Sequence, residues 1–378
     1  MIKITSVDAE IIQHPDSPPP SWLGESVIAN PMSIYPEYYA RRSSWTAPFG
    51  EVWVTVSTDA GIAGSGITVG GDAVIPIISR HFARLLVGQD PFDIEKLWDQ
   101  MFRASLPYGR RGLAIHAISA VDMALWDILG KAENLPVYKL LGGSTKAQIP
   151  VYQTTNDPTD WADSAFFGVK LAIPYGPIDG TEGIQGNVAL IKACREAIGP
   201  KRDIMLDCYM AWDVNYTLRM IDAVEPLGVR WVEEPLPPDD YHGYEQLGKY
   251  STPVAIATGE HEHTRWGFRE LIETGGVTIL QPDLAWVGGI SETRKICAMA
   301  SAYGLQVIPH AGGLSAAGLH LIKSQVNVPF AEWVRTWDRD KGRPMSVIRG
   351  IPDPENGAIN PSDDPGLGMS YIASKGSQ

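Results

Sequence analysis

The middle of the chain repeats one pattern, in which a short apolar run ends in an acidic residue or a histidine and a stretch with helical spacing follows. Five such runs lie between Ile204 and His310, and their last residues are 23 to 27 positions apart. Each interval has room for one strand, one helix and two loops. The residues that end the five runs are Asp207, Glu233, Glu260, Asp283 and His310. In a (β/α)₈ barrel the strand ends meet on one face, where active sites are built, so these five side chains are expected to converge.

Three further apolar runs bring the set to eight. VYQTT and FGVKLAI precede the five runs, and VPFAEWV follows them. Between the runs, segments such as NVALIKACREAI and ETRKICAMASAYG space their apolar residues as amphipathic helices do. The alternation predicts an α/β fold, with a TIM-like (β/α)₈ barrel over residues 141–336.

The first 140 residues have a different texture. An alternating strand opens the chain, a hairpin turning at Asp59–Gly61 follows, and helical patterns lie near 73–88, 92–105 and 112–133. Strands followed by helices predict a small α+β domain over residues 1–140.

Two segments of this chain lack a regular pattern. Residues 14–48 form a loop rich in Pro, Ser and aromatic residues, and a loop this long in a compact protein is either disordered or functional. Its many rings favour a functional loop, since such rings need a surface to pack against. The tail, 337–378, is rich in Pro, Gly and Asp and is predicted to pack back on the N-terminal domain as an irregular cover.

Composition limits the partners. The formal net charge is −13, which argues against nucleic acid or an anionic membrane as a partner. A small anionic substrate stays open, because a bound divalent metal can outweigh the global field. The three cysteines are widely spaced and suit a reducing compartment. No signal-peptide pattern opens the chain and no run approaches the roughly 18 apolar residues of a membrane span, so a cytoplasmic protein is expected.

Asp207, Glu233 and Glu260 are the candidate metal ligands. They offer only oxygen, from three different elements, and hard cations such as Mg²⁺ accept that ligand set. Acids at strand ends can also cap the following helix. Three acids at matched spacing, each behind an apolar run, favour the metal site.

His310 and Asp283 are the candidate general base and its partner. Asp283 ends the preceding strand and could fix the tautomer of the ring and raise its basicity. A structural histidine is the alternative for His310.

His261, beside Glu260, could reach the substrate. Lys170 ends the second barrel strand and could counter developing negative charge, although an ordinary exposed lysine would read the same way.

The motifs together resemble the enolase superfamily over nearly the whole chain. The helix AISAVDMALWDILGKAENLPVYKLLGG is similar to the segment that links the capping domain of that superfamily to its barrel. LDCYMAWDVNY, VEEPLPP, TGEH, QPDLAWVGGI and IPHAGG resemble its successive strand ends. The resemblance implies that residues 1–140 are an N-terminal α+β capping domain on a modified TIM barrel.

Within the superfamily the chain resembles the acid-sugar dehydratases, and most of all the group acting on L-rhamnonate, through NPMSIY, EEPLPPDDYHGY and VPFAEW. The resemblance implies Mg²⁺ on Asp207, Glu233 and Glu260, and a His310–Asp283 base. It also implies that Glu332, on the eighth strand, stabilises the transition state and that Arg41, in the long loop, binds substrate. The expected enzyme is a hydro-lyase that makes a 2-keto-3-deoxy acid from a sugar acid such as L-rhamnonate or L-lyxonate, and a symmetric homo-oligomer.

Two departures bear on this hypothesis. The second strand reads Lys170–Leu171–Ala172, so a second lysine that serves many superfamily members as a base is absent. Because a racemase or epimerase needs a base on each face of the carbanion, Ala172 favours elimination, with the racemase as the alternative. Val27 stands where the rhamnonate group has a substrate-contacting histidine, which leaves the sugar acid open. A non-catalytic binding relative would be expected to have lost a metal carboxylate or His310.

Overall fold

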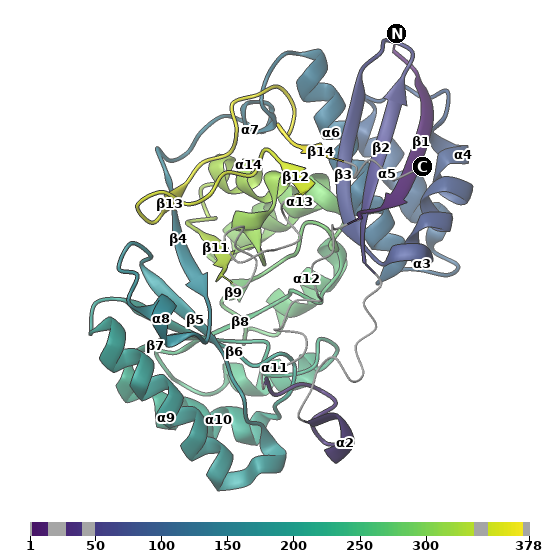
Figure 1. Ribbon diagram of the computed structural model, residues 1–378. Coiled ribbons are helices and arrows are strands. Elements are labelled where there is room, and N and C mark those ends of the chain that lie inside the picture. Colours follow the sequence, from purple (N-terminus) through teal and green to yellow (C-terminus); the bar gives the residue numbers. More distant parts are fainter. Residues whose placement is uncertain (1, 14–27, 40–49, 336–346, 373–378) are drawn as a thin grey trace.

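The computed structural model describes residues 2–13, 28–39, 50–335 and 347–372. A small antiparallel sheet with its helices lies beside a larger parallel sheet ringed by helices (Figure 1). This is the predicted class, a TIM-like barrel with an N-terminal capping domain.

The capping domain is built on three antiparallel strands in the order β1–β2–β3. Their bounds are Ile4–Ile11 (β1), Glu51–Thr58 (β2) and Ala63–Val69 (β3). Helix α6 (Leu113–Ala132) packs across β3 at very short range. A Cβ on Gly66 would lie 1.9 Å from the carbonyl oxygen of Ala120, and one on Gly64 would lie 2.0 Å from that of Ala124. Glycine at these two positions of β3 therefore allows the helix to pack closely on the sheet.

The helix predicted over residues 73–88 is divided in the structure. It consists of α3 (Gly71–Pro76), a π-helical turn (Ile77–Phe82) and α4 (Ala83–Leu86). Pro76 lacks a backbone N–H, so the regular hydrogen-bond ladder changes at that point. The other helices of this region are α5 (Ile94–Ser105) and α7 (Val137–Leu140), and a short helix, α2 (Pro36–Tyr39), lies in the described part of the long loop.

Eight parallel strands form the larger sheet, in the order β10–β9–β8–β7–β6–β5–β4–β11. Their bounds are Ile149–Thr154 (β4), Gly168–Ala172 (β5), Asp203–Asp207 (β6), Val229–Glu233 (β7), Ala255–Thr258 (β8), Ile279–Leu280 (β9), Gln306–Val307 (β10) and Ala331–Val334 (β11). All eight coincide with the apolar runs of the sequence. Because β11 returns to pair with β4, the first and last strands of the barrel lie side by side.

Helices follow the strands around the outside of the sheet. They are α8 (Pro158–Trp161), α9 (Gly180–Ile198), α10 (Val214–Val224), α11 (Tyr241–Gly248), α12 (Thr264–Glu273), α13 (Gly289–Ala302) and α14 (Ala316–Ser324). Short polar side chains begin several of them: Asp213 accepts from the amide of Tyr216, and Asp240 accepts from that of Gly243. These capping residues are not the strand-end acids. Asp207 and Glu233, which precede α10 and α11, therefore do not cap these two helices.

The bottom of the barrel interior is filled by rings and aliphatic side chains. The members of this layer are Tyr152, Met205, Trp231, Ala257, Ile279, Ile308 and Phe330. Trp231 and Phe330 stack with their planes 2° apart, and Tyr152 meets Trp231 edge-on. The polar side chains of the interior lie nearer the carboxyl ends of the strands than this layer does.

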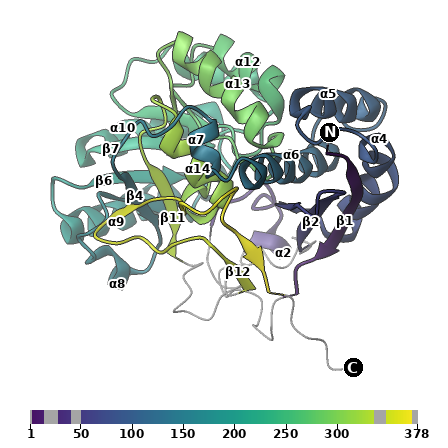
Figure 2. The same cartoon turned by 90° about the horizontal axis from the view of Figure 1, so that it is seen from above.

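The C-terminal segment runs back along the capping domain, which Figure 2 shows from above. Strands β12 (Ile348–Arg349) and β14 (Ser370–Tyr371) pair with each other, and β13 (Ala358–Ile359) pairs with β4. The ring of Tyr371 lies 5.6 Å from that of Trp53, and Asp127 accepts from the amide of Leu367. The domain boundaries at residues 140 and 336 stay predictions.

Candidate active site

Lys170 is the centre of a buried ionic cluster inside the barrel. Its ammonium contacts Glu233, lies 2.8 Å from Glu332 Oε1 and 3.7 Å from Asp207 Oδ2. The lysine is 1% exposed, so it is not the ordinary surface lysine that the sequence left open. Although burial works against the charge, Glu233 and Glu332 raise the pKa of Lys170 well above its usual value.

Both carboxylates beside Lys170 are held from more than one element. The second oxygen of Glu233 accepts from Gln281 Nε2 at 2.7 Å and from Trp231 Nε1 at 3.1 Å. Glu332 accepts from the Thr154 hydroxyl at 2.5 Å and from the amide of Ala311 at 2.8 Å. These contacts fix each carboxylate as a rigid part of the barrel wall.

His310 and Asp283 form a close pair, as predicted. His310 Nδ1 lies 2.7 Å from Asp283 Oδ2, and the ionised carboxylate can only accept, so Nδ1 carries the proton. The other oxygen of Asp283 accepts from the amide of Ala285 at 2.7 Å. Nε2 is left facing Glu260 Oε1 at 3.4 Å. Burial opposes the charged ring, but Glu260 and Asp283 raise the pKa of His310 to about 10.

Glu234 is a site residue that the strand-end pattern did not single out. Its side chain accepts from the backbone amide of His261 at 3.1 Å and lies 2.7 Å from His261 Nδ1. His261 Nε2 in turn lies 3.8 Å from Glu260. Burial opposes the protonated ring, yet Glu234 and Glu260 raise the pKa of His261 to about 9. The two adjacent acids of VEEP are the signal in the sequence, and the strand-end pattern selects only the first of them.

The donor set fits a hard divalent cation. Asp207 and Glu233 are neighbours in register across β6 and β7, and Glu234, Glu260 and His261 bring ligand atoms within 4.8 Å of one another. Burial and the neighbouring Glu260 and Glu234 raise the pKa of Asp207 to about 6. Burial likewise raises the pKa of Glu233 to about 7. Carboxylates crowded in this way need more positive charge than Lys170 alone supplies, and oxygen donors are what Mg²⁺ prefers.

Trp286 is the ring that joins the two histidines. It lies 5.3 Å from His261 and 5.6 Å from His310, measured between ring centroids. His116 of α6 also stacks on Trp286, at 5.9 Å between ring centroids. His116 therefore adjoins the site through Trp286, and no pattern in the sequence predicts this contact.

Part of the long N-terminal loop reaches the barrel. The amide of Ala29 donates to the carbonyl of Ile173 at 2.9 Å, and the Tyr39 hydroxyl donates to Asp179 Oδ1 at 2.8 Å. Arg41 and Val27 lie outside the described residues, so the substrate role of Arg41 stays a prediction. The roles assigned to the other site residues are predictions as well, although the structure places the side chains together.

Two family models match the chain. The mandelate racemase / muconate lactonizing enzyme N-terminal domain matches residues 25–142, and the enolase C-terminal domain-like model matches residues 159–374. Together they span the capping domain and the barrel.

Individual relatives are similar over almost the full length. A relative from Caldivirga maquilingensis is 45% identical over 346 residues, which cover 90% of this chain and 86% of the relative. The L-rhamnonate dehydratase of Saccharopolyspora erythraea is 40% identical over 353 residues, 92% of this chain and 90% of that protein. The crystal structure of rhamnonate dehydratase from Gibberella zeae complexed with Mg superposes with a TM-score of 0.91, at 37% identity, over 98% of this chain and 94% of that chain.

The chain belongs to the mandelate racemase/muconate lactonizing enzyme subgroup of the enolase superfamily. Its similarity to L-rhamnonate dehydratases over nearly the whole length makes it a hydro-lyase of the dehydratase type.

Proposed function

We propose that the protein catalyses the Mg²⁺-dependent dehydration of a sugar acid, L-rhamnonate or a stereochemical relative such as L-lyxonate, to the 2-keto-3-deoxy acid. The observation that carries this proposal is the His310–Asp283 pair facing Glu260, within a site that also holds a buried lysine and its carboxylates. The proposed ligands of the cation are Asp207, Glu233 and Glu260.

The cation, when bound, supplies a Lewis acid that lowers the cost of negative charge on the substrate carboxylate. His310 Nε2 is the proton acceptor, because Nδ1 already carries a proton held by Asp283. In the metal-free protein Glu260 helps to keep the ring protonated. A cation that balanced the charge of Glu260 would weaken one of the carboxylate interactions that raise the pKa of His310, and would so lower that pKa.

We infer elimination because His310 is the one base that we assign among the described residues. His310 takes the proton from C2, and the electron pair left there forms the C2–C3 double bond as the C3 hydroxyl leaves. The proton on His310 is delivered to that hydroxyl, so water is released and the ring is neutral again. The enol product then tautomerises to the 2-keto acid. Glu332 and Lys170, fixed in the barrel wall, set the electrostatic field around the reacting carboxylate.

Ala172 is the observation that weighs against a racemase. It sits two residues beyond Lys170 on β5, pairs with Asp207 across the sheet and offers no proton acceptor. A racemase of this fold would need a second base on the opposite face of the substrate.

A panel assay tests the proposal. The purified protein is mixed with Mg²⁺ and a set of aldonic acids that includes L-rhamnonate and L-lyxonate, and 2-keto acid formation is followed. We expect keto acid from one or a few of these acids and none after chelation with EDTA. Failure of every acid in the panel to give keto acid would remove the dehydratase from consideration.

A further inference from the structure

The loop between β9 and α13, residues 281–288, holds His310 on two sides. Asp283 binds its Nδ1 atom, and the ring of Trp286 lies against its imidazole. The orientation of the base therefore depends on where this loop sits. The barrel holds the loop through backbone bonds at Gln281, Pro282 and Val287, and the capping domain holds it at Ala285 and Gly288.

Capping-domain side chains hydrogen-bond to the loop and to the start of α13. The Thr68 hydroxyl donates to the carbonyl of Ala285 at 2.8 Å. The amide of Gly288 donates to the Ser119 hydroxyl at 2.9 Å, and the Gly288 carbonyl accepts from Trp98 Nε1 at 2.8 Å. Each of these bonds fixes a backbone group of the loop from the other domain.

The start of α13 is held in the same way. The amide of Ser291 donates to Asp122 Oδ2 at 3.0 Å, and Trp126 Nε1 donates to the Ser291 hydroxyl at 2.9 Å. The two domains approach so closely here that a Cβ on Gly289 would lie 2.4 Å from Asp122 Oδ2. The backbone at Gly288 and Gly289 has φ of 121° and 80°, which favours glycine.

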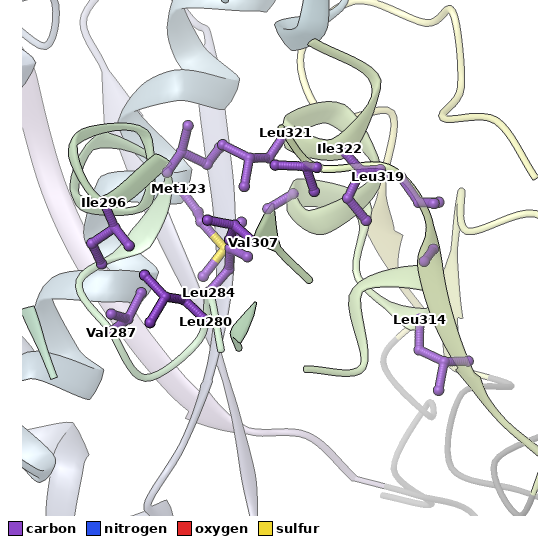
Figure 3. Close-up of a cluster of buried hydrophobic side chains, with 14 of the residues drawn as sticks. Met123, Leu280, Leu284, Val287, Ile296, Val307, Leu314, Leu319, Leu321 and Ile322 are labelled. Atoms are coloured by element: carbon purple, nitrogen blue, oxygen red, sulfur yellow. The ribbon is translucent and has the colours of Figure 1, made fainter. Parts of the chain in front are cut away.

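An apolar contact lies behind the hydrogen bonds. Figure 3 shows Met123 of α6 among Leu280, Leu284 and Val307, with Val287 of the loop close by. These side chains are at most 3% exposed. The contact brings the two domains together, whereas the hydroxyl groups of Thr68 and Ser119 select one backbone position for the loop.

We propose that Thr68 and Ser119 are positioning residues for the His310–Asp283 pair, so that the capping domain sets the geometry of the base as well as covering the barrel. Neither hydroxyl has a catalytic part in the mechanism derived above. Both are fully buried, and each binds a backbone group within three residues of Asp283 or Trp286. The kinetic half of this inference rests on the proposed function, while its structural half does not.

The test compares Thr68→Val, Ser119→Ala and the double variant with the wild-type protein. Each substitution removes a hydroxyl and leaves a backbone group of the loop unpaired. We expect kcat of the double variant to fall about tenfold or more, because small displacements of a catalytic group cost that much, while KM stays within about twofold. Thr68→Ser keeps the hydroxyl and should restore kcat to near the wild-type value.

Ser79→Ala is the matched control. Ser79 is an exposed capping-domain serine whose hydroxyl bonds only within its own helical segment, to Ile75, and its loss should leave kcat unchanged. If the double variant keeps the wild-type kcat, or if Thr68→Ser loses as much activity as Thr68→Val, the inference is wrong.

A crystal structure of the double variant decides the structural half independently of turnover. We expect the distance from Asp283 Oδ2 to His310 Nδ1 to open from 2.7 Å beyond hydrogen-bonding range. An unchanged pair would overturn the inference. Absence of dehydration by the wild-type protein would instead refute the proposed function, while the distance would still decide the role of the two hydroxyls.

Discussion

Lys170 and His310 belong to one site, yet the surroundings that hold them differ. Lys170 lies on β5 and is surrounded by groups from other barrel strands or their ends, among them Glu233 and Glu332. His310 follows β10 and is held by a loop that the capping domain fastens through Thr68, Ser119 and their neighbours. The carboxylate side of the site is thus intrinsic to the barrel, whereas the basic side depends on the contact between domains.

Because of this difference, substitutions on the two sides of the site are expected to have different effects. Changes on the barrel side are expected to disturb the stability of the fold and the binding of the cation together. Changes on the basic side are expected to reduce turnover while the barrel and its metal affinity stay intact.

The largest effect is expected for His310→Asn. Asparagine cannot accept the C2 proton, so kcat should fall by at least about a hundredfold, the lower end of what general acid–base catalysis supplies. Isothermal titration with Mg²⁺ should give a wild-type affinity. His242→Asn, on an exposed position of α11, serves as the control. Retained turnover in His310→Asn would take the base role away from this residue.

Lys170→Met is expected to have the largest effect on the stability of the fold. Removing the lysine leaves Glu233 and Glu332 as buried carboxylates without their cation, which costs about 3–5 kcal/mol of unfolding free energy. Denaturant unfolding monitored by circular dichroism measures it, with the exposed Lys139→Met as control. A stability equal to that of the control would mean that the cluster does not contribute as described.

Glu233→Gln and Glu234→Gln separate the two adjacent acids. Glu233→Gln should weaken Mg²⁺ affinity by about tenfold or more, since a lost ligand costs at least as much as a lost partner of a ligand. Glu234 is engaged by His261, so its replacement should have a smaller effect on affinity. The reverse order of the two affinities would assign the ligand to Glu234 and correct the choice made from the sequence.

The smallest effect is expected at the contact between the two domains, where Asp122 is buried. Burial raises the pKa of Asp122 to about 7 in the folded protein, above its unfolded value. The folded state therefore keeps this proton longer, and stability should fall as pH rises from about 4 to 7. In Asp122→Asn the melting temperature should fall less over that range, and Asp72→Asn, at an exposed position of α3, should behave as the wild type. A pH profile of Asp122→Asn equal to that of the wild type would show that the carboxyl of Asp122 does not cause the loss of stability with rising pH.

Most of the site residues carried by the barrel strands could be predicted from the sequence. Asp207, Glu233 and Glu260 end short apolar runs, and the period of the barrel brings such ends to one face whatever the loops do. The prediction that Lys170 ends the second strand is wrong, because Lys170 lies in the middle of β5. The pairing of His310 with Asp283 followed from the same rule, because the two residues end consecutive strands.

The remaining features depend on contacts that no local pattern encodes. Glu234 turns toward His261 because its backbone adopts a positive φ of 41°. The two adjacent acids of VEEP do not predict this backbone conformation. The contact of Ser119 with Gly288 joins residues 169 positions apart and depends on how one domain docks on another. Arg41 lies outside the described residues, and its assignment as a substrate-binding residue rests on resemblance.

Turnover, in D₂O with Mg²⁺, of the sugar acid that the panel assay identifies decides between elimination and racemisation when it is followed by NMR. A single base on His310 predicts that the sugar acid is converted to the 2-keto-3-deoxy acid, with no accumulation of a C2 epimer. Deuterium at C2 of an epimerised acid, without loss of water, would contradict the account and favour a racemase.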